Sequence, residues 1–322
     1  MYLPKEKEAH AMNEKTRIQI EEMKKQTFGV EVEMNNITRE KAAKAVTELF
    51  GTGRYENTAD RNGYCAWSAW DMEGREWKFQ KDVSISGPDN EKCEMVTPVL
   101  HYEDMELFQE VIRTLRHNKA KSSASRGCGV HIHIGSDGHT PQTIRNLVNM
   151  MASHEDQLIK AVEIGYGRLG HYCRTVDEGF LQRINRRKPK TNEALARVWY
   201  NGETEYGHYS QTRYRMLNLH SYFHRYHTIE FRLFQFDDPK DGKQNGLHAG
   251  QAKAMIQLCL AMSQLAKQIR TASPRKQQTE NEAYAFRTFM LRLGFIGDEF
   301  KTAREYFMRN FEGNSAWRRT AA

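Results

Sequence analysis

Three short segments of the chain alternate apolar residues with ionisable residues at every second position. The segments are 28–34, 129–135 and 228–234. Because successive side chains of a β-strand point to opposite faces, this spacing predicts three strands, each with one apolar face and one charged face. Two charged side chains on one strand then lie about 6.7 Å apart. In chain order, the charged faces carry Glu31 and Glu33, His131 and His133, and Glu230 and Arg232.

The same alternation would arise on a solvent-exposed sheet face, which is the favoured interpretation for any one strand taken alone. Exposed faces usually carry Thr, Ser, Lys and Gln, whereas these six residues are carboxylates, imidazoles and one guanidinium. Carboxylates and imidazoles bind metals, and arginine pairs with phosphate. Taken together, the three strands favour a metal site over an exposed face.

The residue types also limit the kind of metal. Several carboxylates on one face repel each other, and a divalent cation with oxygen ligands, Mg²⁺ or Mn²⁺, relieves that repulsion. A tetrahedral zinc site is less natural, because the carboxylates are too many and no cysteine accompanies the histidines. Histidine is an unusual ligand for Mg²⁺, so we expect either a site that accepts Mn²⁺ or a histidine that contacts a nucleotide.

Further acidic residues lie between the first two of these strands. Asp82, Glu91 and Glu94 are alternatives for one more metal ligand, and Glu94 is favoured because it opens an apolar segment. Arg213 and Arg215 are expected to share a face and to neutralise charge on a transferring phosphoryl group. An exposed basic edge is the alternative for these two arginines.

The composition excludes several classes of protein. The chain has 322 residues and is 39% hydrophobic, which is enough for a sizeable core. No apolar run approaches 18 residues, and the N-terminus has no signal-like stretch, so we expect neither a membrane span nor secretion. Five widely spaced cysteines fit a reducing cytoplasm. The net charge of +7 permits an anionic partner, nucleic acid included, without requiring one.

No nucleotide-binding glycine loop and no serine nucleophile motif is present. Cys128 could act as a nucleophile beside His131, but a buried cysteine in a glycine turn is the favoured interpretation. Helices are expected over 38–50, 102–118, 141–164 and from 246 to about 312, whereas 166–210 looks irregular and basic. The strands and helices interleave, which favours one α+β domain.

Read in order, these segments resemble the amidoligases, distant relatives of glutamine synthetase and glutamate–cysteine ligase. The resemblance spans about residues 27–236. It implies a curved antiparallel sheet lined with metal ligands, packed on helices and followed by a helical C-terminal region. It also implies that ATP phosphorylates a carboxylate, and that an amine then attacks the acyl phosphate to form an amide or peptide bond. The cofactors would be ATP and Mg²⁺, with Mn²⁺ as a substitute.

The resemblance also implies roles for individual residues. Metal ligands would be Glu31, Glu33, Glu94, His131 and Glu230. Nucleotide contacts would come from His131, His133 and Arg232, and the acyl phosphate would be stabilised by Arg213 or Arg215 together with Arg232. The partners would be a carboxylate-bearing acceptor, such as an amino acid or peptide, and an amine donor. On this basis we expect a charged arm at 1–26, the catalytic domain at 27–246 and a helical extension of that domain at 247–322.

Two other functions remain open at this point. The same carboxylates and histidines could hold two metals in a hydrolase or nuclease, with the basic stretch 183–190 along a nucleic-acid backbone. An inactive binding module is the third hypothesis. The sequence does not identify the substrates or the oligomeric state.

Overall fold

The computed structural model describes residues 13–59, 63–202, 210–224, 226–238, 246–276 and 278–316. These residues form two compact units. The first, called here the sheet unit, comprises Thr27–His133 and Leu233–Lys253. The second, the helical unit, comprises Ile134–Arg232 together with the segments before Thr27 and after Lys253. The chain therefore passes from one unit to the other within two of its strands and one long helix.

The sheet unit is built on a mainly antiparallel sheet. Its strands are β1 (Phe28–Met34), β2 (Tyr55–Asn57), β3 (Trp67–Trp70), β4 (Glu76–Gln80), β5 (Cys93–Val96) and β6 (Val130–Gly135). They lie in the order β2-β3-β4-β5-β1-β6, and the pairs β2–β3, β3–β4, β4–β5 and β5–β1 are antiparallel. β1, the strand that carries the first two predicted ligands, is therefore an interior strand.

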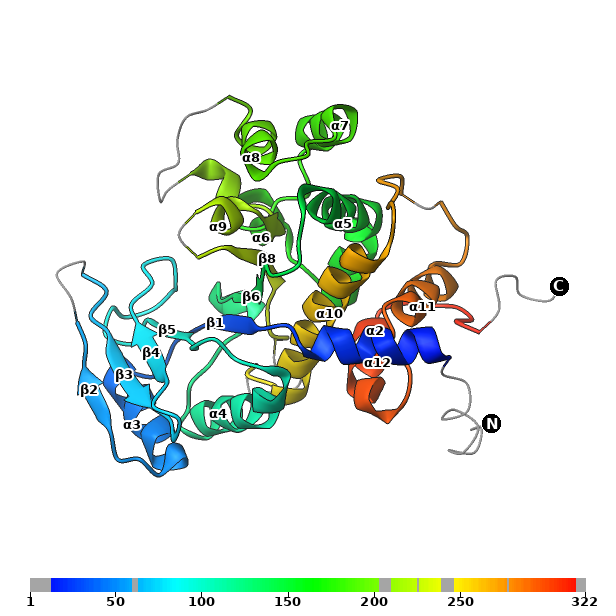
Figure 1. The fold of residues 1–322 in the computed structure, drawn as a ribbon. Helices are drawn as coiled ribbons and strands as arrows, with labels where there is room; N and C mark the ends of the chain where they lie inside the picture. The colour runs from blue at the N-terminus through cyan, green and yellow to red at the C-terminus, as the bar shows by residue number, and fades with distance from the viewer. Residues whose placement is uncertain are drawn as a thin grey trace. The chain divides into compact units, whose positions relative to one another are not determined.

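Two helices of the sheet unit pack where their sequences predict. Helix α3 (Arg39–Phe50) begins after Thr38, whose hydroxyl accepts a hydrogen bond from the Lys41 amide, and ends at Gly51 in the left-handed conformation. It packs against β3 and β4, as Figure 1 shows, and against α4 (Met105–His117). The predicted apolar stripe of α4 is buried, and its members are Met105, Phe108, Val111, Ile112 and Leu115. A 3₁₀ turn at Tyr102–Asp104 leads into α4, and another lies at Ala124–Arg126.

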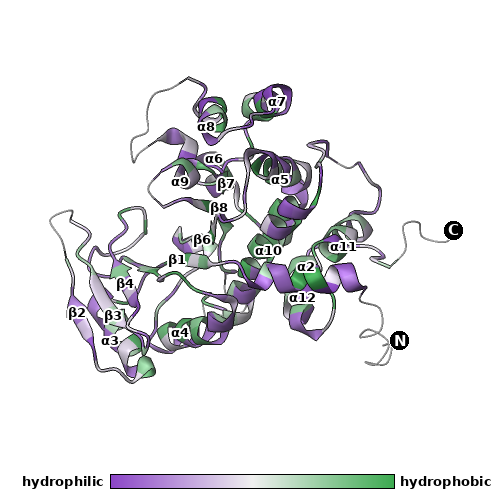
Figure 2. Cartoon of the chain, in the orientation of Figure 1, coloured by the Kyte–Doolittle hydropathy of each residue, from purple (hydrophilic) through white to green (hydrophobic). Residues whose placement is uncertain are grey.

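The helical unit contains most of the helices. They are α2 (Glu14–Lys24), α5 (Pro141–Val162), α6 (Tyr166–His171), α7 (Glu178–Arg187), α8 (Asn192–Tyr200), α9 (His220–Phe223), α11 (Glu282–Arg292), α12 (Lys301–Met308) and most of α10 (Ala249–Gln268). α10 is hydrophobic along much of its length, as Figure 2 shows, and most of its side chains are buried. Strands β7 (Leu217–Asn218) and β8 (Thr228–Phe234) pair antiparallel, and short 3₁₀ helices lie at Gln211–Arg213 and Asp298–Phe300. The α+β class predicted from the sequence is confirmed.

Two predictions about secondary structure need correction. The stretch 166–210 was expected to be irregular, but it contains α6, α7 and α8. α7 is capped by Asp177, whose side chain accepts a hydrogen bond from the Phe180 amide, and it buries Phe180 and Ile184 one turn apart. The arginines that surround these two residues hide the helical period. Residues 203–209 lie outside the described part of the chain.

The C-terminal region is helical but not continuously so, because residues 269–281 separate α10 from α11 and contain Pro274, which cannot continue a helix. The expected N-terminal arm includes helix α2, which buries Gln19 and Met23, while its first twelve residues are not described. Within the described ranges, no helix is both long enough and apolar enough to cross a membrane.

Candidate metal centre

Glu33 and Glu94 lie directly opposite each other on the antiparallel strands β1 and β5. Directly opposed residues project from the same face of a sheet, so the two carboxylates face the same way. Both side chains are buried, and Glu94 is only 5% exposed. Opposed like charges destabilise a sheet, and burial increases the cost. Such a pair therefore calls for a compensating positive charge.

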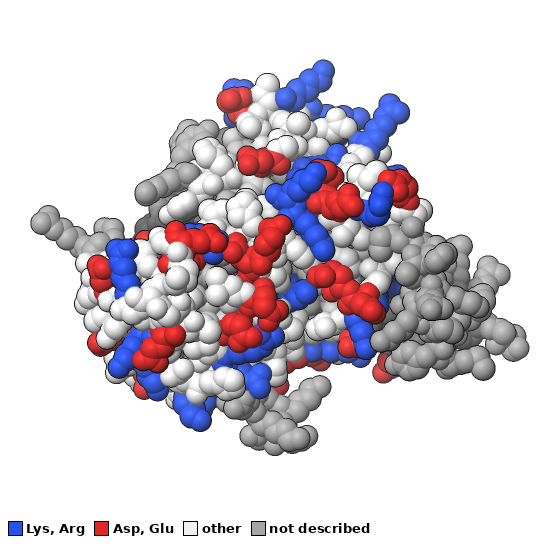
Figure 3. Space-filling view, turned by 60° about the horizontal axis from the view of Figure 1, so that its bottom comes forward, with Lys and Arg blue, Asp and Glu red and all other residues white. Residues whose placement is uncertain are grey.

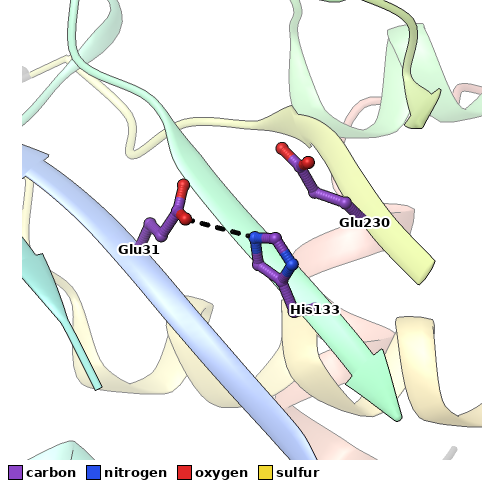
Figure 4. Close-up of side chains that lie close together, drawn as sticks. All are labelled: Glu31, His133 and Glu230. Atoms are coloured by element: carbon purple, nitrogen blue, oxygen red, sulfur yellow. Dashed lines mark ion pairs between the residues drawn. The ribbon is translucent and has the colours of Figure 1, made fainter. Parts of the chain in front are cut away.

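Strand β6 brings two histidines to the same carboxylates. His131 Nδ1 lies 2.9 Å from one oxygen of Glu31, and its Nε2 lies 3.8 Å from Glu33. His133 Nε2 lies 3.3 Å from the other oxygen of Glu31, as the dashed line in Figure 4 shows. The backbone amide of Gly129 donates to Glu33 at 2.6 Å. The alternation recognised in the sequence thus places Glu31, Glu33, His131 and His133 together.

Asp82 completes the cluster from the loop after β4. Its carboxylate accepts a hydrogen bond from the Ser84 amide at 2.7 Å, which fixes the turn. Among the described residues of the sheet unit, two sets of three offer ligand atoms within 4.8 Å of one another. These sets are Glu33, Asp82 and Glu94, and Glu31, Glu94 and His131, so Glu94 is shared.

The pKa values of two acids of the centre, Glu94 and Glu31, are shifted in opposite directions. Burial raises the pKa of Glu94 well above its usual value, and repulsion from Glu31, Asp82 and Glu33 raises it further. Burial also acts to raise the pKa of Glu31, but attraction to His133 and hydrogen bonds with both histidines outweigh it and lower that pKa well below its usual value. The metal-free centre therefore favours the protonated form of Glu94, and a bound divalent cation would favour the ionised form.

The donor atoms match hard divalent cations. The set of Glu33, Asp82 and Glu94 offers only carboxylate oxygens, which is what Mg²⁺ prefers. The set of Glu31, Glu94 and His131 adds one imidazole nitrogen, which Mn²⁺ accepts more readily. No cysteine belongs to either set. The residues present thus suit Mg²⁺ or Mn²⁺ better than zinc.

The three acidic residues that the sequence offered as alternatives for a further metal ligand have different positions in the structure. Asp82 and Glu94 belong to the clusters, whereas Glu91 lies in a turn where its amide donates to the Pro88 carbonyl, and it belongs to neither set. Sequence reasoning missed Gln80, whose side-chain amide donates to Glu94 at 2.7 Å. Gln80 lies directly opposite Glu94 on the paired strands β4 and β5, and no local pattern in the sequence reveals that register.

Glu230 and Arg232 belong to the helical unit, on strand β8 (Figure 4 draws Glu230 there). The two side chains form a buried ion pair. Glu230 also accepts a hydrogen bond from the Asn218 side chain at 2.6 Å. The carbonyl of Arg232 accepts one from Arg168 at 3.1 Å. Their predicted roles with the other ligands remain predictions.

Arg213 and Arg215 have different neighbours. The Arg213 guanidinium lies 5.6 Å from the centre of the Tyr214 ring, and that of Arg232 lies 5.9 Å from the same ring. Arg215 instead donates to the Thr175 carbonyl at 3.1 Å and pairs with Asp177 at 3.3 Å. A 3₁₀ turn that ends at Arg213 breaks the strand period on which the expectation of a shared face rested.

The surroundings of Cys128 and the distribution of surface charge bear on two alternatives that the sequence left open. Cys128 is fully buried beside Gly127, which adopts a left-handed conformation with φ of 68°. Figure 3 shows acidic and basic side chains interspersed on the face that it draws, so the net positive charge is not concentrated there. This distribution is unlike a continuous basic track for a nucleic-acid backbone.

The chain was compared with solved structures, curated proteins and protein families. It is similar in structure to a bifunctional glutathione synthetase from Pasteurella multocida, with a TM-score of 0.45 and 11% sequence identity. That similarity covers 91% of this chain and 49% of the synthetase, so the chain spans about half the length of that protein. No curated protein matches it. The sequence profile described as "Putative amidoligase enzyme" matches residues 24–263, and because this range covers most of the chain and every predicted ligand, the chain belongs to the amidoligase family.

Proposed function

We propose that this protein is an ATP- and Mg²⁺-dependent carboxylate–amine ligase that forms an amide or peptide bond through an acyl-phosphate intermediate. The observation that carries the proposal is the pair of ligand sets that share Glu94, in a chain of the amidoligase family. A carboxylate is a poor electrophile, and phosphorylation gives it a leaving group. Such a reaction needs mainly cations that position and neutralise phosphates.

The geometry of the sheet unit supports the proposed assignment of metal ligands. Glu33, Asp82 and Glu94 would hold one divalent cation, and Glu31, Glu94 and His131 would hold a second that is tolerant of Mn²⁺. When bound, these cations supply charge neutralisation for the nucleotide phosphates. His133 holds Glu31 in place through its ion pair and, with His131, is proposed to contact the nucleotide.

The remaining roles rest on the family resemblance. Glu230 is proposed as a further metal ligand and Arg232 as a phosphate contact. Arg213 or Arg215 is proposed to stabilise the acyl phosphate, because a guanidinium binds phosphate oxygens through paired donors. We also propose the curved sheet of glutamine synthetase as the fold type, with the catalytic domain at 27–246 and its helical extension at 247–322.

The reaction can be tested without knowing the substrates. ADP release from ATP is measured with Mg²⁺ or Mn²⁺ in the presence of pooled amino acids and short peptides, and products are sought by mass spectrometry as condensates that have lost one water. We expect release that needs both the cation and a carboxylate. In a well-folded sample, failure of ATP to bind in the presence of either cation would contradict the proposal.

The acyl phosphate has its own signature. One oxygen of the activated carboxylate leaves with the phosphate when the amine attacks. A carboxylate labelled with ¹⁸O should therefore transfer one labelled oxygen to inorganic phosphate. Unlabelled phosphate from a productive reaction would exclude this intermediate while leaving the ligase activity in place.

A further inference from the structure

A cavity of about 420 Å³ lies within the helical unit. None of the residues that line it belongs to either ligand set. It is lined by α5, by α7, by the end of α8 and by the segment 212–217. Its volume lies in the range of small-molecule sites, roughly 300–1,000 Å³. We propose that this cavity binds a small monocarboxylate with an apolar or aromatic body.

One wall of the cavity is apolar and held in a fixed position. Phe180 and Trp199 are buried and meet edge to face, with ring centres 4.9 Å apart. The indole N–H of Trp199 donates to the Thr212 hydroxyl at 3.0 Å, which fixes the orientation of the ring. Leu217 adds a buried aliphatic side chain. A preformed wall of this kind favours an aromatic or branched organic group.

The charged residues that line the cavity set the sign of the ligand. They are Asp177, Arg183 and Arg215. Asp177 pairs with Arg215 at 3.3 Å, but its carboxylate lies 3.9 Å from the guanidinium of Arg183, which is too long for a hydrogen bond. Two guanidinium groups and one carboxylate leave one net positive charge. A ligand with a single negative charge, such as a monocarboxylate, neutralises it.

Arg183 supplies the donor that selects a carboxylate. Its side chain lines the cavity and is 22% exposed, so part of its guanidinium is accessible to a ligand. A guanidinium binds a carboxylate through two parallel N–H donors. The carboxylate of the ligand would therefore pair with Arg183 while its organic body contacts Phe180 and Trp199.

The test uses 3-phenylpropanoate and its uncharged analogue 3-phenylpropanamide, which differ in charge but hardly in size. Binding is followed by the indole N–H resonance of Trp199 in ¹⁵N-labelled protein, assigned with the Trp199→Phe variant. We expect the carboxylate to shift this resonance and to bind at least about tenfold more tightly than the amide, the value of one charge-assisted hydrogen bond. Equal binding of the two, or no shift up to the order of 10 mM carboxylate, would overturn the proposal.

A matched pair of variants locates the carboxylate. Arg183→Gln should weaken 3-phenylpropanoate at least about tenfold. Arg187→Gln, on the same helix but exposed and outside the cavity, should leave it unchanged. Unchanged affinity in Arg183→Gln would refute the assignment, and the acid–amide comparison in the unmutated protein stands even if that variant fails to fold. Since the assay contains neither nucleotide nor metal, its outcome is independent of the ligase proposal.

Discussion

Glu33 and Glu94 face each other across the antiparallel strands β1 and β5, as a buried pair of like charges on one side of the sheet. A pair placed this way lowers the stability of the protein unless a proton or a cation separates the charges. Two further carboxylates, Glu31 and Asp82, add to the repulsion on Glu94. Repulsion among these carboxylates thus lowers the stability of the metal-free protein, and the same carboxylates attract divalent cations.

The first prediction concerns the stability of the metal-free protein. The raised pKa of Glu94 means that ionising it weakens the folded state, progressively as pH rises from the usual glutamate range to the raised value. Glu94→Gln removes that penalty, so it should raise the unfolding free energy of the metal-free protein at pH 7.5. The gain should disappear near pH 3.5, below the usual glutamate pKa, where Glu94 is largely protonated in both states. Urea unfolding at the two pH values measures it, and a loss of stability at pH 7.5 would contradict the account.

Glu31→Gln should have the opposite sign. The pKa of Glu31 is lowered below its usual value, chiefly by attraction to His133 and by hydrogen bonds from both histidines that outweigh burial. The ionised carboxylate therefore stabilises the fold above the ordinary glutamate pKa, and this contribution is lost as pH falls through the lowered value. We expect Glu31→Gln to lower the melting temperature at pH 7.5, where Glu94→Gln raises it. A shift of the same sign in both variants would show that the two acids do not differ as described.

Metal binding should release a proton. Because the raised pKa of Glu94 favours its protonated form and a bound cation favours the ionised form, Mn²⁺ binding should liberate up to about one proton per protein molecule. Calorimetry in buffers of different ionisation enthalpy measures this number. Glu94→Gln removes the carboxyl group that carries this proton, so any Mn²⁺ that still binds to the variant should release no proton. Equal proton release by the variant and the unmutated protein would assign the proton to another group.

A histidine outside the centre should govern acid stability. Burial, together with the charge of Lys267, lowers the pKa of His139 to about 3, and its two nitrogens lie 3.0 Å from Thr143 and 2.9 Å from Ser263. The unfolded chain protonates near the usual histidine pKa and the folded chain does not. The stability that neutral His139 contributes is therefore fully present above about pH 6.5 and is lost as pH falls toward 3. His139→Gln should flatten the unfolding free energy over that window, whereas the exposed His171→Gln should keep the slope.

A partly buried ion-pair network around Arg75 should support the sheet unit. Arg75 binds Asp104 through two hydrogen bonds of 2.9 Å each and Asp71 through a third of 2.9 Å. Arg75→Met leaves the buried Asp71 without its cation, so it should cost about 2–4 kcal/mol of unfolding free energy. Arg17→Met, which breaks an exposed pair with Glu14, should leave the melting temperature unchanged. Mn²⁺ affinity should stay the same in both variants, and a loss with Arg75→Met would link the two regions.

Much of the site could be predicted because strand period and residue chemistry agreed. The alternation in β1 and β6 fixed the faces of Glu31, Glu33, His131 and His133 without any long-range information. The caps of α3 fixed its ends in the same local way. Glu94 was chosen for the apolar residues that follow it, and the strand register places it opposite Glu33.

What depended on tertiary structure could not be predicted. Asp82 reaches the cluster from a loop whose path no periodicity describes, so the sequence could not rank it above Glu91. β2 has three residues, too few to show a period. α7 and α8 are stabilised by a few buried residues such as Phe180 and Trp199, among arginines that dominate the composition. The neighbours of Arg215 follow from the position of Asp177, 38 residues earlier.

The most direct test of the central claim is a titration of Mn²⁺ followed by the electron paramagnetic resonance signal of the free ion. The unmutated protein should remove Mn²⁺ from solution, and Mg²⁺ should compete for the same sites. Glu94→Gln, which removes the acid shared by both ligand sets, should weaken binding at least about tenfold, while the neighbouring Glu91→Gln should bind normally. Equal Mn²⁺ binding by these two variants, or none by the unmutated protein, would contradict the account.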